Sequence, residues 1–323
     1  MVASFKSNCI VQSFGMLFIM AASALSSGCS GVGNQSPPGV LSAGAVSTGW
    51  QPVQPIAALQ PGASAGTLYA SSPGANTVTE YQLPGDAIIG TLGASSGLSA
   101  PGGLFFSKEH LYVTNGNQVL IFGVGQTMPT LTIRDPAPFA DDVVVGNDGT
   151  VYVANEEDDY EGYGDVLVFK KNRTVAEYTI IPPKVNEVGS VTLDSSNNLY
   201  IAYTLLNNST RIEKYAPGSQ KGEDTRWSLG YPGGMAFDKS GNLVIADKTR
   251  IDVFAPGAAK PTRTFGSLSY GVSVRFNQSQ THLFATDYGA NQIDEFDYAT
   301  GDILKAFSLA GAAGLAIDPP ASL

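Results

Sequence analysis

The sequence predicts an all-β protein, a six-bladed β-propeller of four-stranded blades, because two kinds of run recur together. Leu-Tyr or a similar pair occurs six times between Leu68 and Phe284, in steps of about 43 residues, and propeller blades repeat with this period. Each pair is followed by an apolar run that ends in an aromatic residue. Turn residues separate the runs, and no helical period of 3.6 competes with the pattern.

Two runs occur in every unit. The pairs are Leu68-Tyr69, Leu111-Tyr112, Val151-Tyr152, Leu199-Tyr200, Leu243-Val244 and Leu283-Phe284. The runs that end in an aromatic residue are Val78–Tyr81, Val119–Phe122, Val166–Phe169, Ile212–Tyr215, Ile251–Phe254 and Ile293–Phe296.

Two further runs complete the four strands of a unit. The third is clear in four units, at Thr130–Ile133, Thr225–Leu229, Thr262–Phe265 and Ile303–Phe307. The fourth is often introduced by glycine, and occurs at Gly103–Phe106, Asp142–Val145, Ser190–Leu193, Gly234–Phe237, Ser273–Phe276 and Gly314–Ile317. Runs such as Val143-Val144-Val145, which are apolar throughout, fit blades that are packed on both faces.

The fifth unit carries a family resemblance. Its segment Gly-Gly-Met-Ala-Phe-Asp-Lys-Ser-Gly-Asn-Leu-Val-Ile-Ala-Asp, from Gly233 to Asp247, resembles an NHL-type repeat of the TolB/SMP-30-like propellers, and Ile251-Asp252-Val253-Phe254 continues the match. The resemblance extends over about residues 67–323. It implies that the glycine-introduced run is the innermost strand and that the next three runs lie progressively outward.

The resemblance also implies how the ring closes. In this register the first unit lacks an inner strand, whereas Gly314–Ile317 is left without a blade of its own. Pairing of this C-terminal inner strand with the N-terminal blade gives six blades. Seven blades, with strands added from the preceding segment, are the alternative, but Pro52 and Pro55 suit no central strand.

The N-terminal part predicts a signal peptide over residues 1–28 and a tether over residues 29–66. Lys6 is followed by the short apolar stretch Ile10–Leu25 and then by small residues, as in export signals; a transmembrane anchor is disfavoured by that length. Ser26-Ser27-Gly28-Cys29 resembles the bacterial lipobox and implies a lipid on Cys29, with ordinary cleavage as the alternative. The uncharged Gly/Ser/Pro/Ala-rich segment that follows predicts a flexible tether. An outer-envelope lipoprotein is therefore expected, or else a periplasmic or secreted protein.

Composition restricts the partners. The 323 residues include 18 Lys and Arg against 28 Asp and Glu, which gives a formal net charge of −10. Such a chain offers no basic footprint for a phosphate backbone, so nucleic-acid binding is not expected. Membrane contact is expected only through the lipid anchor, and the body is expected to be a monomer.

Few residues suit catalysis. His110 and His282 fall in tight turns on the face opposite the loops that enter the inner strands, so histidine-dependent lyases of this fold are a poor match. Lactonases of the SMP-30 type resemble this fold and hold a divalent cation where the inner strands start. Of the residues at those starts only Asp141 could be a ligand, and one carboxylate does not supply the several oxygens that such a cation needs.

These observations favour a binding or scaffold module for a protein, a glycan or a small ligand, held by the face where the inner strands begin. A metal-dependent propeller enzyme of the lactonase or lyase type is the alternative. A purely structural or adhesive role is the third possibility.

The third unit carries the sharpest site hypothesis. Its loop from Asn155 to Asp165 has six carboxylates in eleven residues, and Asp141 and Asp142 begin the inner strand of the same blade. Both segments open on the same face, and a bound Ca²⁺ would relieve the repulsion among their charges. The predicted ligands are Asp141, Asp142, Asn155, Asp158 and Asp159. A solvated acidic loop is the alternative.

Arg275 is unusual because it lies within a predicted inner strand. A buried guanidinium requires a partner. A structural ion pair and an anion-binding role at the centre of the ring both remain open.

Overall fold

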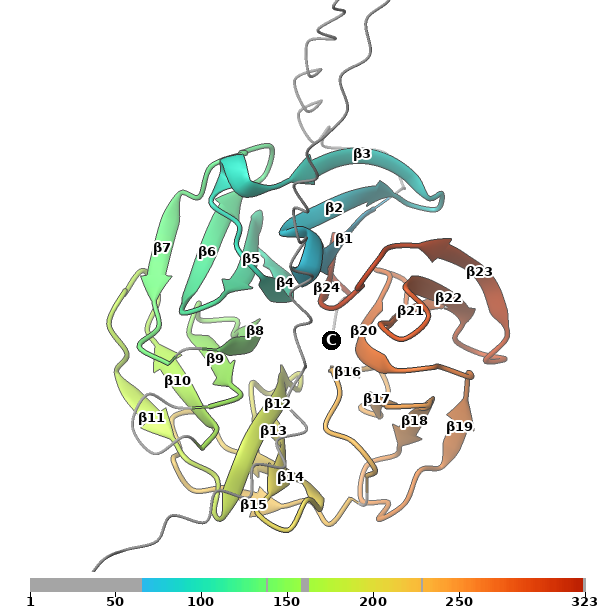
Figure 1. The fold of residues 1–323 in the computed structure, drawn as a ribbon. Coiled ribbons are helices and arrows are strands. Elements are labelled where there is room, and N and C mark those ends of the chain that lie inside the picture. Colours follow the sequence, from blue (N-terminus) through green and yellow to red (C-terminus); the bar gives the residue numbers. More distant parts are fainter. Residues whose placement is uncertain (1–65, 138, 158–162, 228, 322–323) are drawn as a thin grey trace, which may run out of the picture. The chain divides into compact units, whose positions relative to one another are not determined.

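The computed structural model describes residues 66–137, 139–157, 163–227 and 229–321. Over these residues the chain forms 24 strands and two short 3-10 helices, Pro73–Ala75 and Ala94–Ser96. The strands pair into six four-stranded sheets, all of their pairings antiparallel, and these blades follow one another around a ring (Figure 1). The predicted six-bladed β-propeller is confirmed.

Each blade extends from an innermost strand at the centre of the ring to an outermost strand at its rim. From the centre outward, blade 1 consists of β24 (Leu315–Asp318), β1 (Thr67–Ser72), β2 (Thr77–Gln82) and β3 (Ala87–Leu92). Blade 2 consists of β4 (Pro101–Ser107), β5 (His110–Asn115), β6 (Gln118–Gly123) and β7 (Leu131–Arg134). Blade 3 consists of β8 (Ala140–Val145), β9 (Val151–Asn155), β10 (Asp165–Phe169) and β11 (Tyr178–Ile180).

The other three blades have the same order. Blade 4 consists of β12 (Val185–Leu193), β13 (Leu199–Leu205), β14 (Thr210–Tyr215) and β15 (Glu223–Asp224). Blade 5 consists of β16 (Met235–Phe237), β17 (Leu243–Asp247), β18 (Arg250–Phe254) and β19 (Arg263–Phe265). Blade 6 consists of β20 (Gly271–Phe276), β21 (His282–Asp287), β22 (Gln292–Asp297) and β23 (Ile303–Ser308).

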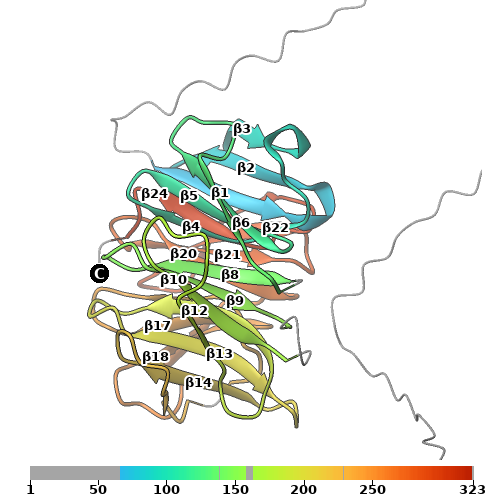
Figure 2. The ribbon, with the colours of Figure 1, turned by 90° about the vertical axis from the view of Figure 1, so that its left-hand side faces the viewer.

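The ring is closed by the last strand. The inner strands contact one another in turn, β4 with β8, β8 with β12, β12 with β16, β16 with β20, β20 with β24 and β24 with β4. At the junction of the two chain ends β24 pairs with β1, so that Leu68 lies opposite Ile317 and Ala70 opposite Leu315. This is the pairing that the repeat register implied. Seen edge-on, the strands run from one face of the ring to the other (Figure 2).

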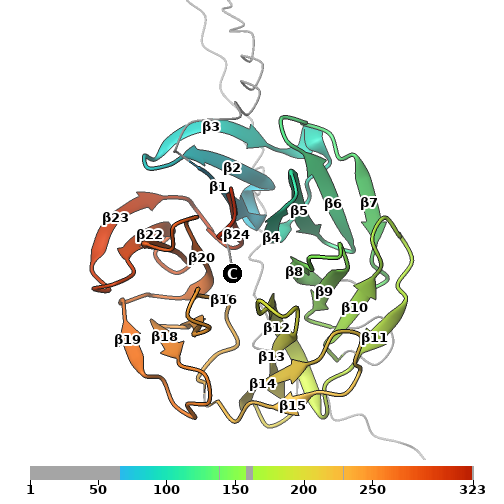
Figure 3. The same cartoon turned by 180° about the vertical axis from the view of Figure 1, so that it is seen from behind.

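The hydrophobic core is divided among the seams between neighbouring blades. Each of six clusters of buried side chains joins two adjacent blades, as where Tyr69 of blade 1 stacks on Phe106 of blade 2 with ring centroids 5.8 Å apart. Strands β9, β10 and β17 are buried at every residue. Each blade lies between two neighbours in the ring (Figure 3). Both blade faces are therefore buried, which explains why the sequences of these strands do not alternate between polar and apolar residues.

The strand boundaries of blade 4 differ most from the prediction. The outer strand of blade 4 is Glu223–Asp224, not Thr225–Leu229. The chain leaves the sheet edge after Asp224, and Trp227 packs into the seam with blade 5, stacked on Tyr200 with centroids 6.0 Å apart. In the same blade β12 begins at Val185, five residues before the predicted run, and two bulges interrupt its pairing with β13.

The two faces of the ring carry different parts of the chain. The entry face is where the inner strands begin, and the exit face is where they end. The described chain starts on the exit face, because Thr67 pairs with Asp318 and the Leu83 amide donates to the Gly66 carbonyl at 2.7 Å. Among the described residues no helix has the length and apolar character to cross a membrane. The predicted signal peptide, Cys29 and residues 29–65 of the predicted tether lie outside the described residues.

Candidate binding site at the entry face

Three carboxylates of blades 3 and 4 come together on the entry face. Asp141 is the second residue of β8, Glu156 follows β9 and Glu187 lies in β12. The Glu156 amide donates to the Phe139 carbonyl at 3.0 Å, which ties the start of the acidic loop to the segment that leads into Asp141. The Gly164 amide donates to the Asn186 carbonyl at 2.9 Å, which ties the end of the loop to the segment that carries Glu187.

Gly164 is required for this close approach. A Cβ atom at that position would lie 2.3 Å from the Val188 nitrogen and 2.8 Å from the Glu187 carbonyl carbon. Both of these are backbone atoms, which cannot yield as the end of a flexible side chain would. Only glycine allows the loop to cross β12 here.

Burial and neighbouring carboxylates raise the pKa values of all three side chains. Asp141 is exposed to solvent, and its pKa is raised well above its usual range by the desolvation that the surrounding protein imposes and by the charges of Glu156, Asp142 and Glu187. The pKa of Glu156 is raised by burial and by Glu187 and Glu157, and that of Glu187 by burial and by Glu157. None of the three forms an ion pair with a residue that the structure describes.

Three tyrosines continue the site over blades 5 and 6. The ring of Tyr270 lies 5.3 Å from that of Tyr231, at 62°, and 6.3 Å from that of Tyr288, at 67°. Both are edge-to-face contacts. The pKa values of Tyr231 and Tyr270 are raised, mainly by burial and to a lesser extent by the charges of Asp141 and Glu156. The two rings therefore lie close enough to these carboxylates to be affected by their charge. We call Asp141, Glu156, Glu187, Tyr231, Tyr270 and Tyr288 the acidic-aromatic patch.

The patch already holds one ammonium group of the chain itself. Lys248 Nζ lies 5.7 Å from the centroid of the Tyr270 ring. This is within the range in which a cation is attracted by an aromatic face. The Tyr270 ring therefore already has a cation of the chain itself within this range.

Buried carboxylates fix the backbone under two of the tyrosines. Asp247, at the end of β17, accepts hydrogen bonds from the amides of Gly230 at 2.9 Å and Tyr231 at 2.6 Å. Asp287, at the end of β21, accepts from Ser269 at 2.7 Å and Tyr270 at 2.8 Å. These hydrogen bonds satisfy backbone N–H groups just before each inner strand. They also fix the backbone from which the tyrosine side chains extend.

Sequence reasoning missed Glu187, Tyr231, Tyr270 and Tyr288. In the repeat register Glu187, Tyr231 and Tyr270 are equivalent, each two residues before the position that Asp141 occupies in blade 3. The available sequence signal was the Asp at the end of the second strand in blades 5 and 6. This Asp accepts hydrogen bonds from the backbone segment that carries the tyrosine.

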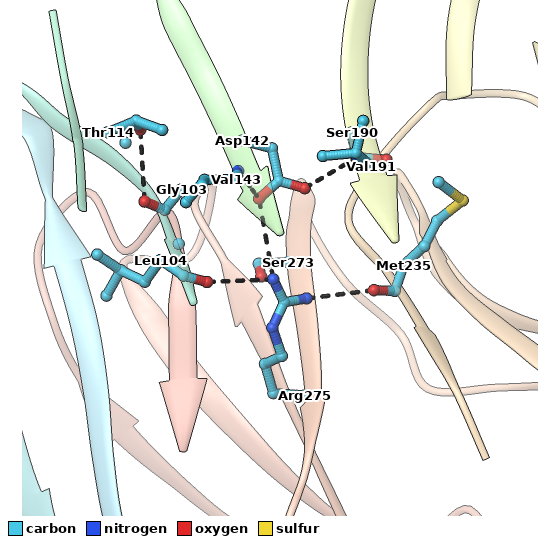
Figure 4. A network of polar contacts seen from close by, with 12 residues as sticks. Gly103, Leu104, Thr114, Asp142, Val143, Ser190, Val191, Met235, Ser273 and Arg275 are labelled. Atoms are coloured by element: carbon cyan, nitrogen blue, oxygen red, sulfur yellow. Dashed lines mark hydrogen bonds and ion pairs between the residues drawn. The ribbon is translucent and has the colours of Figure 1, made fainter. Parts of the chain in front are cut away.

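Asp142, a predicted calcium ligand, instead points toward Arg275 of blade 6 (Figure 4). Its Oδ1 lies 3.8 Å from Arg275 Nη2 and accepts a hydrogen bond from the Val143 amide at 2.9 Å. Its Oδ2 accepts from the Val191 amide at 3.1 Å. Both oxygens thus have partners within the protein.

Arg275 joins several blades through one buried side chain. It donates from Nη1 to the Met235 carbonyl at 3.2 Å and the Val274 carbonyl at 2.8 Å, and from Nη2 to the Leu104 carbonyl at 3.2 Å. Burial lowers its pKa, and the charge of Asp142 opposes this change. Of the two roles left open for Arg275, the contacts show the structural ion pair.

The other predicted calcium ligands are only partly described. Asn155 is fully buried and donates from Nδ2 to Asp165 Oδ1 at 2.8 Å and to Asp135 Oδ1 at 3.5 Å. Asp158 and Asp159 lie outside the described residues. Within the described ranges no three His, Cys, Asp or Glu side chains are arranged to hold a metal. The Ca²⁺ site stays a prediction.

Both histidines lie at the exit-face turns, in the first position of a second strand. His282 Nδ1 lies 2.6 Å from Glu295 Oε1, and His110 Nδ1 lies 2.8 Å from the Lys108 carbonyl oxygen. Their positions separate them from the acidic-aromatic patch.

Comparisons with known proteins show the fold. No protein-family model and no curated protein matches the sequence. Among solved structures 1044 chains match, so the architecture is widespread and does not by itself select a function. One, from "Crystal structure of Nidogen/Laminin Complex", has a TM-score of 0.64 at 18% sequence identity, and the match covers 78% of this chain and 98% of that chain. The chain is therefore similar to that propeller in fold.

Proposed function

We propose that this chain is an exported, lipid-anchored β-propeller that binds a protein partner at its entry face, through a basic segment of the partner. The observation that carries the proposal is the acidic-aromatic patch. It combines three mutually repelling carboxylates that lack an ion pair among the described residues with a tyrosine that already contacts an ammonium group.

Electrostatics favours a cationic ligand over a neutral one. A positive charge near Asp141, Glu156 and Glu187 would stabilise their ionised forms and lower their pKa values towards the usual range. Aromatic faces attract Lys and Arg side chains by about 0.5–2 kcal/mol each. Tyrosine and carboxylate together therefore suit a Lys- or Arg-bearing segment.

The start of the described chain is compatible with this role. Gly66 and Asp318 lie side by side on the exit face, opposite the patch. A solved propeller of similar fold comes from a complex of two proteins, which supports a protein partner as the first class to test.

The binding test uses octalysine as the basic probe and calorimetry as the readout. The triple variant Asp141→Asn, Glu156→Gln, Glu187→Gln is expected to bind octalysine roughly tenfold or more weakly than the wild type. The matched control neutralises Glu177, Glu223 and Asp302, three exposed carboxylates outside the patch. It removes the same charge and should stay within about twofold of the wild type. Equal losses in both variants would show that net charge alone attracts the probe.

The affinity for octalysine should also depend on pH. Because the pKa values of the patch carboxylates are raised, they take up protons at a higher pH than ordinary Asp and Glu. Affinity should fall as the pH is lowered from 8 to 5, and the triple variant should lack this dependence.

The proposed anchor is tested separately in the bacterial envelope. Cys29→Ser removes the only lipid acceptor that the lipobox-like motif provides, so a protein that pellets with membranes should become soluble. Unchanged membrane fractionation of this variant would contradict the lipid anchor and leave the binding site unaffected.

A further inference from the structure

A second polar site lies in the seam between blades 1 and 2, away from the entry-face patch. A small pocket is lined there by Tyr69, Glu80, Leu92, Phe106, Leu111 and Phe122. The cavity volume is about 10 Å³, which is room for one water-sized group. The segment from Gly123 to Gln126 also borders the pocket, and Gln126 is exposed.

The two polar groups in this pocket have no hydrogen-bond partner among the residues that the structure describes. Tyr69 is 2% exposed, and its side-chain hydroxyl is buried without a partner among the described residues. Glu80 is 5% exposed and forms neither a hydrogen bond nor an ion pair with any described residue. The two residues face each other directly in the pairing of β1 with β2.

A buried carboxylate without a partner is energetically unfavourable, and here the effect appears as raised pKa values. Burial raises the pKa of Glu80, and the Glu80 charge adds to the burial that raises the pKa of Tyr69. Leaving such groups without hydrogen-bond donors has a free-energy cost. A ligand that supplied hydrogen-bond donors and a positive charge would remove this cost.

The walls of the pocket are apolar and aromatic. The rings of Tyr69 and Phe106 are stacked at 5.8 Å and 7°, and Phe122, Leu92 and Leu111 belong to the same buried cluster. Aromatic walls attract an ammonium group, and apolar walls accommodate an alkyl stem. The small volume admits an –NH₃⁺ head but not a quaternary ammonium.

We propose that this pocket is a binding site for a primary ammonium group, with the Glu80 carboxylate and the Tyr69 hydroxyl oxygen as its acceptors. A primary ammonium has three donors and one charge, whereas each acceptor here needs a donor and Glu80 also needs a counter-charge. A single water molecule fits the volume but cannot neutralise the carboxylate.

The test compares methylammonium with tetramethylammonium at matched ionic strength and pH 8, on the full chain. Calorimetry should show methylammonium binding that tetramethylammonium does not reproduce, and only methylammonium should raise the melting temperature beyond the effect of salt. Glu80→Gln should weaken methylammonium binding roughly tenfold or more. Tyr69→Phe keeps the stacked ring and should weaken it several-fold.

Two controls separate this site from the rest of the molecule. The triple variant of the acidic-aromatic patch should keep the selectivity for methylammonium, because its substitutions are remote from the pocket. Glu80→Gln preserves side-chain shape and removes a buried charge, so without ligand it should melt no lower than the wild type at pH 8. Equal effects of the two cations, full methylammonium binding by Glu80→Gln, or a crystal structure with only water at Glu80 under saturating methylammonium would each overturn the proposal.

Discussion

Arg275 and Asp142 meet at the centre of the ring, from inner strands that belong to opposite blades, with Nη2 and Oδ1 3.8 Å apart. Blade 6 supplies the guanidinium and blade 3 the carboxylate. Hydrogen bonds to Leu104 and Met235 bring blades 2 and 5 into the same contact. One side chain therefore links four of the six inner strands, at a place where neighbouring blades pack mainly through apolar seams.

Removing either partner of this pair should destabilise the ring. Arg275→Met leaves Asp142 as a buried charge without its counter-ion, and we expect a loss of about 3–5 kcal/mol in the free energy of unfolding. Adding Asp142→Asn should restore part of it, because the uncompensated charge is then gone. Urea unfolding of the two single variants and the double variant measures this coupling, and strictly additive losses would contradict it.

Ring closure predicts the effect of a C-terminal truncation. Deleting residues 314–323 removes β24, with the buried side chains of Leu315 and Ile317, and exposes the inner edge of β1. The melting temperature should fall by roughly 10 °C or more. Deleting residues 319–323 alone is the control and should have a much smaller effect. Equal melting of the two truncated proteins would place the closure elsewhere.

Asp294 predicts a pH-dependent stability. This buried residue has its pKa raised from 3.8 to about 6, mainly by desolvation. The folded state then holds the proton more tightly than the unfolded chain, so stability is fully present below about pH 4 and declines as the pH rises to about 6. Asp294→Asn should remove this slope, which amounts to up to about 3 kcal/mol. Urea unfolding between pH 4 and 8 measures it, and an unchanged slope in the variant would assign the effect to other groups.

The calcium hypothesis is tested on the acidic loop. If Asp141 and the loop residues Asp158 and Asp159 hold Ca²⁺, millimolar Ca²⁺ should raise the melting temperature by a few degrees. The double variant Asp141→Asn, Asp158→Asn should lose this rise, whereas Glu177→Gln with Asp302→Asn should keep it. Absence of both a binding heat and a melting shift in the wild type would leave the loop as charged surface.

The strand pattern could be predicted from the sequence because each blade repeats the same local signals. Pairs such as Leu199-Tyr200 and terminal aromatics such as Tyr215 recur because every blade buries the same positions between two neighbours. The exception is informative. The outer strand of blade 4 ends early, before Trp227. A large aromatic side chain is stabilised more by burial in the seam between blades than by a position at the sheet edge.

The candidate site was less predictable because it is assembled from different blades. Asp141 and the acidic loop stood out as a charge run, but Glu187 and Tyr270 are single residues whose neighbours in sequence show nothing unusual. Only the ring brings them together. The contacts of the Asp142 side chain could not be predicted either. Its partner Arg275 is distant in sequence, and both carboxylate oxygens contact residues of other blades.

The most direct measurement is nuclear magnetic resonance of ring-labelled tyrosines while octalysine is titrated into the protein. Assignment by single Tyr→Phe variants identifies each signal. The proposed site predicts shifts at Tyr231, Tyr270 and Tyr288, and none at the buried Tyr152 and Tyr215. Shifts confined to tyrosines outside the acidic-aromatic patch, or no shift at Tyr231 and Tyr270 under saturating probe, would contradict the entry-face binding site.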